Sequence, residues 1–458
     1  MSVREATALD LAGQVLEACR GEDAEVVVHR ERSGLARFAG SEVHQPTLIE
    51  NSNVHLRVAR DSRVGAASTN RISKDAFRAL ARRATEVAES APADPLFQGF
   101  ALPAELPQVE GHDERTADLR AEEQAAHAAA AIDASRPFDA YGFFTTGLTE
   151  LAIASTTGQA AEQSMTDAVA LVLAAGDDAS GWAEQAAWSV DEIDTAACAR
   201  EAAEKAAATL GAVEIEPGAY PAVLEPYALA ELLEYLSIPT FSGLSLLEGG
   251  SYFCDRLGQP VFDQAVSIAE DPLDPRGLPK AFDWEGVAKQ RVELVENGVA
   301  TGVVWDRRTA ARAGDDTAST GNGLPGQFAR FGPQALALSV APGDAASVDE
   351  LLERIGDGIY VTHLHYLSIV NPREAIVTGM TRDGTFRVRD GKLAEPLVNL
   401  RFTVSVPEFL AEVPGLSRET TLVNRSAFYG DRYVYGALVP AIASAKFNVS
   451  GVGSRPGL

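Results

Sequence analysis

The sequence predicts an α+β protein of two or three domains whose C-terminal half is rich in strands. Its 458 residues are too many for one hydrophobic core, so we expect several domains. Helical and strand-like patterns alternate as far as about residue 213. Beyond it, short strand-like runs separated by turn residues dominate, and few helical patterns occur.

Residues 1–95 form the first predicted α+β unit. An amphipathic helical pattern at 1–21 precedes several β-rich runs. Residues 51–69 alternate apolar and polar side chains around a charged turn, which is typical of a β-hairpin. Ser73 then precedes apolar residues at helical spacing, so it is suited to be a helix N-cap. The order is helix, strands, helix.

A linker and a second α+β unit follow. Residues 93–116 are rich in proline and glycine and have no period, so we interpret them as the linker. Residues 117–213 begin with an alanine-rich helical pattern, continue with strand-like runs and end with a second strong helical pattern. The sequence therefore predicts the same classes of element as in the first unit.

Residues 214–458 form the predicted β-rich C-terminal domain. Residues 220–226 indicate a strand that leads into a helix from about Tyr227. Ser347 and Glu350 have the spacing of a capping box at the start of another helix.

Composition excludes several classes of function. The formal net charge of −26 repels phosphate backbones, so we expect no nucleic-acid partner. The N-terminal run lacks the apolar region of a signal peptide, and no stretch approaches about 20 uninterrupted apolar residues, so we expect a cytoplasmic protein without a membrane partner. Three scattered cysteines disfavour a disulfide framework or a thiolate zinc site.

Candidate catalytic strings are incomplete. No G-x-S-x-G elbow, Walker A string or His-Glu-x-x-His string occurs. His363 and His365 have ligand-like spacing, because side chains two apart on a strand point to the same face. A metal would need a third ligand, which the sequence does not nominate. The segment after this strand, residues 378–393, predicts a β-meander with charged turns.

Several strings, taken in order, resemble the TldD/PmbA family and its TldE (PmbA) branch in particular. The resemblance covers nearly the whole chain. The N-terminal strings are "RFAGSEVHQPT" and "VHLRVARDSRVGAAST"; the C-terminal ones include "STGNGLPG", "GPQALALSVAPGDAASVDELLERIGDGIYVT" and "NPREAIVTGMTRDGTFRVRDGKLAEPLVNLRF". It implies N-terminal α/β sandwich-type subdomains followed by a β-rich, curved, barrel-like C-terminal domain.

The resemblance also implies a two-component peptidase. In that family a TldD subunit binds zinc through a helical His-Glu-x-x-x-His motif and a later cysteine, and a TldE subunit of the same fold lacks the metal site. The pair trims or degrades short, unfolded peptides. For this chain we therefore expect a TldD-like partner that carries the zinc, and no metal or catalytic residue of its own.

The residues of this chain that align with the His-Glu-x-x-x-His motif support the expectation that it binds no zinc. Ala230 and Tyr235 stand where the two histidines would be, and only Glu231 keeps its identity. Residues 426–450 contain no cysteine that could be the later ligand. A glutamate without a metal-bound water has little to activate.

The strand with the two histidines resembles the cleft strand beside the family's active site. The catalytic branch has a glycine-rich run there, whereas this chain has His363, His365 and Tyr366. An exposed strand edge could hold an extended peptide by strand addition. As a hypothesis, these residues contact substrate together with Thr378 and Arg382.

Two alternatives to a non-catalytic subunit stay open. One is an autonomous hydrolase with a relocated metal site at His363 and His365. The other is a non-enzymatic homodimeric binding protein.

Overall fold

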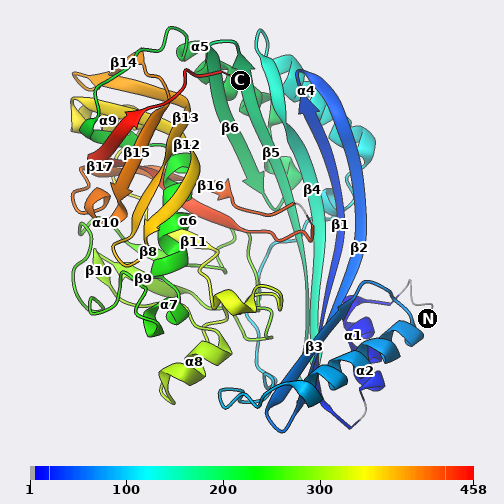
Figure 1. Cartoon of the computed structure of the whole chain (residues 1–458). Helices are drawn as coiled ribbons and strands as arrows, with labels where there is room; N and C mark the ends of the chain where they lie inside the picture. The colour runs from blue at the N-terminus through cyan, green and yellow to red at the C-terminus, as the bar shows by residue number, and fades with distance from the viewer. Residues whose placement is uncertain (1–5, 20, 429, 458) are drawn as a thin grey trace.

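The computed structural model describes residues 6–19, 21–428 and 430–457 (Figure 1). It confirms the α+β fold class. Strands of the N-terminal half form a six-stranded antiparallel sheet, and strands of the C-terminal half form a curled, mixed eleven-stranded sheet.

The N-terminal sheet joins both predicted α+β units. Its order is β3-β2-β1-β4-β5-β6, so β1 of the first unit pairs with β4 of the second along its length. The units at 1–95 and 117–213 therefore share one sheet, and residues 91–113 between them contain no helix or strand. The strands are β1 (Asp23–Ala39), β2 (Glu42–Arg60), β3 (Arg63–Thr69), β4 (Asp139–Ser155), β5 (Ala160–Gly176) and β6 (Ala179–Ala187).

Four helices cover one face of this sheet in two pairs (Figure 1). The pair α1 (Ala8–Ala18) and α2 (Lys74–Ser90) packs on one apolar cluster, and the pair α4 (Ala121–Ala134) and α5 (Thr195–Ala208) packs on another. Each unit thus has the element order α-β-β-β-α. The two units therefore repeat the same order of helices and strands, and they meet where β1 pairs with β4.

A glycine on each outer strand lets a helix approach closely. A Cβ at Gly65 of β3 would lie 2.1 Å from the carbonyl oxygen of Ala84, and a Cβ at Gly181 of β6 would lie 2.1 Å from that of Ala202. Only glycine fits such a contact between strand and helix backbones.

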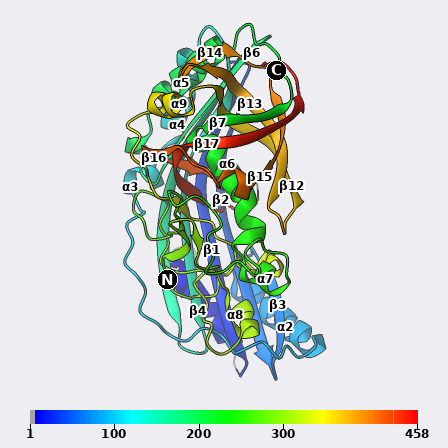
Figure 2. The ribbon, with the colours of Figure 1, turned by 90° about the vertical axis from the view of Figure 1, so that its left-hand side faces the viewer.

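The C-terminal sheet curls and closes on itself. Its order is β10-β9-β8-β11-β17-β15-β13-β12-β7, and a further pairing of β17 with β7 closes a five-stranded ring (Figure 2). The strands are β7 (Gly218–Leu224), β8 (Ile268–Glu270), β9 (Val292–Glu296), β10 (Val299–Ala300), β11 (Leu338–Val340), β12 (Gly358–Asn371), β13 (Ile376–Arg389), β14 (Lys392–Pro396), β15 (Leu400–Ser405), β16 (Gly415–Asn424) and β17 (Gly436–Val452).

Helix α6 (Pro226–Thr240) packs against the inside of this curled sheet and is apolar around most of its circumference. A helix of that composition has to be buried on nearly all sides. The other helices of the described C-terminal residues are α7 (Gly243–Leu247), α8 (Arg307–Ala313), α9 (Val348–Ile355) and α10 (Val406–Phe409), and α3 (Glu114–Ala117) lies in the N-terminal half. No helix in the described ranges is long and apolar enough to cross a membrane.

The helix-free face of the N-terminal sheet packs on the C-terminal domain. Leu151 and Ile153 of β4 contact Ala281 and Phe282 there. The loop after β16 also reaches the sheet, where the guanidinium of Arg432 donates to both carboxylate oxygens of Asp167 at 2.9 and 2.5 Å. Both side chains are almost fully buried.

Gly147 of β4 makes room for that arginine, because a Cβ there would lie 2.3 Å from the Nε of Arg432. The Arg432 backbone N–H also donates to Glu31 on β1 at 3.0 Å. The loop is therefore fixed to β5 through Asp167 and to β1 through Glu31, the strands on either side of β4.

The structure confirms both helix N-caps predicted from the sequence, but only part of the predicted capping box. Ser73 is the N-cap of α2 and accepts a hydrogen bond from the N–H of Ala76, as predicted. Ser347 is the N-cap of α9, but the predicted capping box is incomplete, because the Glu350 carboxylate accepts from Ala346 rather than from Ser347.

The predicted meander at 378–393 is wrong in its first turn. Residues 376–389 form the single strand β13, and Asp383 and Gly384 make a bulge in it with φ of 56° and 139°. The chain turns only at Asp390 and Gly391. Pairing with β12 on one side and β15 on the other keeps the strand extended through the charged residues.

We expect Gly181→Ala to lower the free energy of unfolding by about 1–3 kcal/mol, because the added methyl group collides with α5. Denaturant unfolding followed by tryptophan fluorescence measures the change. Gly13→Ala in α1 is the matched control: a Cβ there meets nothing within 4 Å, so it should stabilise the protein by about 0.5–1 kcal/mol. Equal effects at both positions would contradict the close approach.

Candidate functional site

Strand β7 leads directly into α6, which lies in the interior of the C-terminal domain. Pro226 occupies the first helical position, where its missing N–H breaks no hydrogen bond, and Glu225 is the N-cap. The Glu225 carboxylate accepts from the ammonium of Lys205 at 2.6 Å and from the hydroxyl of Tyr360. These contacts from α5 and β12 fix the start of the helix.

The three motif positions lie in the middle of α6. Ala230 is 1% exposed and packs in the core, and Tyr235 is partly buried against the same core. Glu231 has only 18% of its side chain exposed and faces β12. Of the three, only Glu231 makes polar contacts.

Glu231 is held by backbone and by two cationic groups. Its Oε2 accepts from the N–H of Leu364 at 3.0 Å. Its Oε1 lies 3.7 Å from Nη1 of Arg425 and 3.9 Å from Nε2 of His363. Burial raises the pKa of this carboxyl group, although His363 and Arg425 oppose the rise.

His363 is buried between an aromatic ring and a carboxylate. Its ring stacks on that of Trp182 in β6, with centroids 4.3 Å apart and planes 8° apart. Its Nδ1 lies 3.2 Å from the Asp383 carboxylate in the β13 bulge. Burial disfavours the imidazolium, but the hydrogen bond with Asp383 and the charge of Glu231 outweigh it and raise the pKa of His363.

Two further groups complete the charged cluster, and both come from elsewhere in the chain. Arg425 follows β16 and pairs with Glu234, one position before Tyr235. Glu184 of β6 is 5% exposed and accepts from the N–H of Asn424 at 2.7 Å. Burial raises the pKa of Glu184 to about 7.

This set of side chains does not fit a zinc ion. Zinc sites use three or four imidazole, thiolate or carboxylate ligands, whereas Ala230 offers no donor atom and Glu231 faces a guanidinium. Within the part of the chain that the structure describes, no group of three or more histidine, cysteine or acidic side chains is arranged to hold a metal ion. The positive charge beside Glu231 comes from Arg425, and the raised pKa of His363 favours the cationic form of that ring as well.

The other residues of the cleft hypothesis lie at different depths. His365 is half-buried, and its ring centroid lies 6.3 Å from that of His363. The Nε of Arg382 lies 3.7 Å from the Oδ1 of Asp383. Tyr366 is 77% exposed, with φ of 51°. Thr378 donates to the carbonyl of Phe402 on β15. The structure thus gathers Glu231, His363, His365 and Arg382 but ties Thr378 to the neighbouring strand.

The edge of β12 is partly covered. Strand β7 pairs only with Ile359–Val361, and beyond that point α6 lies along this side of β12. The Leu364 amide, which an added peptide strand could otherwise use, already donates to Glu231.

An open cleft of about 820 Å³ lies beside the motif helix and shares Arg425 with the charged cluster. Ala230 and Glu234 form part of one wall, and the other polar side chains of the lining include Arg425, Gln334 and Tyr435. The remaining lining is mostly apolar and includes Ile238, Phe328, Phe331, Leu336, Ile369 and Pro372. A volume and lining of this kind suit an apolar ligand of several residues.

Sequence reasoning missed Trp182, Glu184, Asp383 and Arg425. The Asp383 signal was present in the string "RDG", which we interpreted as a turn. The other three belong to strands or loops far from α6 in the chain, and no local pattern links them to it.

Comparisons with known proteins agree with this architecture. Residues 217–451 match the family model described as PmbA/TldA metallopeptidase C-terminal domain, and residues 24–88 match PmbA/TldA metallopeptidase domain 1. The first match alone covers more than half of the chain.

Two curated relatives are named as proteases. The chain is 27% identical over 225 residues to a metalloprotease of Methanothermobacter thermautotrophicus, covering 49% of this chain and 48% of the relative. It is 26% identical over 214 residues to a zinc metalloprotease TldD homolog of Saccharolobus solfataricus, covering 44% of each. The chain thus spans about half the length of these relatives.

One solved structure shares nearly the whole fold. TldE from Thermococcus kodakarensis superposes with a TM-score of 0.84 at 19% identity, covering 96% of this chain and 99% of that one. At this identity the likeness shows the fold alone.

We expect Glu184→Gln to stabilise the protein above pH 7. The pKa of Glu184 rises from 4.5 to about 7 on folding, so wild-type stability falls as pH rises through that window, by up to about 3 kcal/mol. Glutamine keeps an acceptor for Asn424 and carries no charge. Denaturant unfolding near pH 4.5 and pH 8 measures the difference.

Glu419→Gln, at an exposed position of β16, is the matched control and should leave the pH dependence unchanged. If Glu184→Gln loses as much stability as the wild type between the two pH values, the buried carboxyl group does not cause the loss.

Proposed function

Because this chain belongs to the PmbA/TldA metallopeptidase family, we propose that it is a TldE-like subunit that holds no zinc and acts beside a TldD-like partner. The partner carries the His-Glu-x-x-x-His motif, the zinc ion and the catalytic step. The complex trims or degrades short, unfolded peptides. This chain contributes structure and peptide contacts.

The observation that carries the proposal is the environment of Glu231. As a general base in a zinc site, a glutamate takes a proton from a metal-bound water whose pKa the metal has lowered. Here the carboxylate accepts from the Leu364 amide and lies within 4 Å of Arg425 and His363. These contacts neutralise the buried charge with protein groups alone.

The peptide part of the proposal is supported by the cleft beside α6. Its mostly apolar walls, with Glu234 and Arg425 in one part, suit an extended unfolded segment. The exposed rings of Phe328 and Phe331, 39% and 53% exposed, offer apolar contact at its lining. Folded proteins bury such segments, so a cleft of this type selects unfolded ones.

We expect no zinc in the purified chain alone and about one zinc ion per complex after co-expression with a His-Glu-x-x-x-His-bearing paralogue. Peptidase activity should appear only in the complex. Metal analysis of both preparations and cleavage of an unfolded peptide measure these outcomes. Stoichiometric zinc in this chain alone would overturn the proposal, and its loss in His363→Ala and His365→Ala would identify the relocated site.

We expect Glu231→Gln in this chain to leave the activity of the complex within about twofold, while the same change in the partner's motif lowers kcat by at least about a hundredfold. The two variants are matched, because both replace a helical glutamate by its amide. Loss of activity from the change in this chain would assign catalysis here. Self-association without any partner-dependent activity would favour a homodimeric binding protein.

A further inference from the structure

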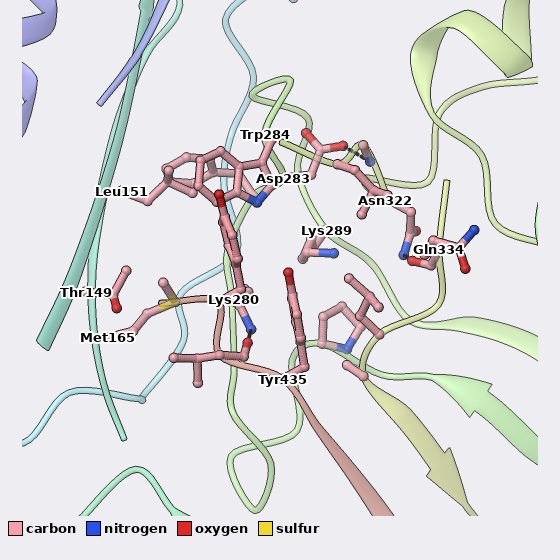
Figure 3. Close-up of a pocket in the computed structure, with 18 of the residues that line it drawn as sticks. Thr149, Leu151, Met165, Lys280, Asp283, Trp284, Lys289, Asn322, Gln334 and Tyr435 are labelled. Carbon is pink, nitrogen blue, oxygen red and sulfur yellow. Dashed lines mark hydrogen bonds between the residues drawn. The ribbon is translucent and has the colours of Figure 1, made fainter. Parts of the chain in front are cut away.

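A second cavity lies where the N-terminal sheet meets the C-terminal domain. It has a volume of about 50 Å³ and is lined by His29 of β1, Thr149 and Leu151 of β4, Met165 of β5, Glu270 of β8 and residues of three C-terminal loops (Figure 3). Those residues include Lys280, Lys289, Asp283, Trp284, Asn322 and Tyr435. None of them belongs to the charged cluster at α6.

Lys280 has a buried ammonium group whose partners among the described residues are carbonyl oxygens and an aromatic ring. Its Nζ donates to the carbonyl oxygens of Val434 at 2.5 Å and Leu278 at 3.5 Å, and it lies 5.5 Å from the ring centroid of Tyr435. No acidic side chain of the described residues lies within 4.0 Å of this nitrogen. Burying an ammonium without a counter-ion is costly, so the site is poised to accept an anion.

Lys289 is only weakly paired. Its Nζ donates to the Gly321 carbonyl at 2.8 Å, and the Oε1 of Glu270 lies 3.9 Å away. That Oε1 already accepts from Asn322 at 3.0 Å, and the Oε2 accepts from the N–H of Ala337 at 2.8 Å. The two lysines therefore line one cavity, and their ammonium groups can donate further hydrogen bonds to a ligand there.

The acidic side chains of the cavity are engaged elsewhere. Asp283 accepts from three backbone amides, those of Glu285, Val287 and Gly323. Burial raises the pKa of both Asp283 and Glu270, which reduces their repulsion of a bound anion. Burial and the charge of Lys289 lower the pKa of Lys280 to about 7.

The cavity adjoins the cleft beside α6. Leu324, Gln334, Leu336 and Tyr435 line both spaces. A single water needs about 10–15 Å³ by this measure, so the cavity has room for a carboxylate group but not for a peptide. A peptide in the cleft could thus place only its end group here.

We propose that Lys280 and Lys289 bind the C-terminal carboxylate of a peptide lying in the cleft. The inference rests on the proposed peptide-handling function and adds the end of the substrate that this chain recognises. A singly charged carboxylate fits two ammonium groups whose other donors are held by carbonyl oxygens. A phosphate dianion fits less well, because Glu270 and Asp283 line the same space.

The test compares a fluorescein-labelled alanine–leucine peptide as the free C-terminal acid and as the C-terminal amide, with binding to the full chain read by anisotropy. We expect the acid to bind at least about tenfold more tightly near pH 6, and the preference to shrink by pH 8.5 as Lys280 loses its proton. Equal binding of acid and amide by the wild type overturns the proposal without any variant.

Lys280→Met should bring the acid-to-amide ratio within about twofold, while Lys392→Met, at an exposed position of β14, should leave it unchanged. Circular dichroism checks that both variants fold. Competition by propionate alone, with no preference for the peptide acid, would assign the site to free small carboxylates and overturn the peptide assignment.

No binding of either peptide or of propionate would also overturn the inference. Zinc content and activity of the complex are read separately. Failure here therefore leaves the proposed subunit role intact, and failure of the complex leaves this binding result intact.

Discussion

The buried salt bridge between Arg432 and Asp167 fixes the loop on which both functional regions depend. The loop begins at Arg425, which neutralises Glu231 and Glu234, and ends at Tyr435, which lines the cleft and the two-lysine cavity. A bidentate arginine–carboxylate pair has a defined geometry, so it holds the loop in one position on the sheet. Loss of either partner would leave a buried charge, at a cost of about 3–5 kcal/mol.

The charged cluster at α6 shows how protein groups compensate the buried carboxylate of Glu231. A buried carboxylate requires a positive charge or several hydrogen-bond donors. In this chain Glu231 receives an amide from β12, a guanidinium from the loop and an imidazole stacked on β6. Two of these groups belong to β12 and the third to the loop after β16, so the cluster also holds α6 against the sheet.

The fold class could be predicted from the sequence because its signals are local. The hairpin turn at Asp61 and Ser62 and the N-cap at Ser73 depend only on neighbouring residues. The site could be predicted only in part. The Leu364–Glu231 and Asn424–Glu184 contacts join residues 133 and 240 positions apart, and periodicity carries no information at such separations. The bulge at Asp383 was missed for the same reason, because the strands on both sides decide it.

The pairing of β7 with β17 has a consequence for the order of folding. Strand β17 also pairs with β11, β15 and β16, so the last long strand of the chain joins more of the sheet than any strand before it. During synthesis β7 leaves the ribosome long before β17 exists, and the ring that contains both strands cannot close until β17 has been made. Long-range pairings of this kind are slow to form. Until then α6 and its mostly apolar surface have no complete cover, and the nascent C-terminal domain is at its most vulnerable to aggregation.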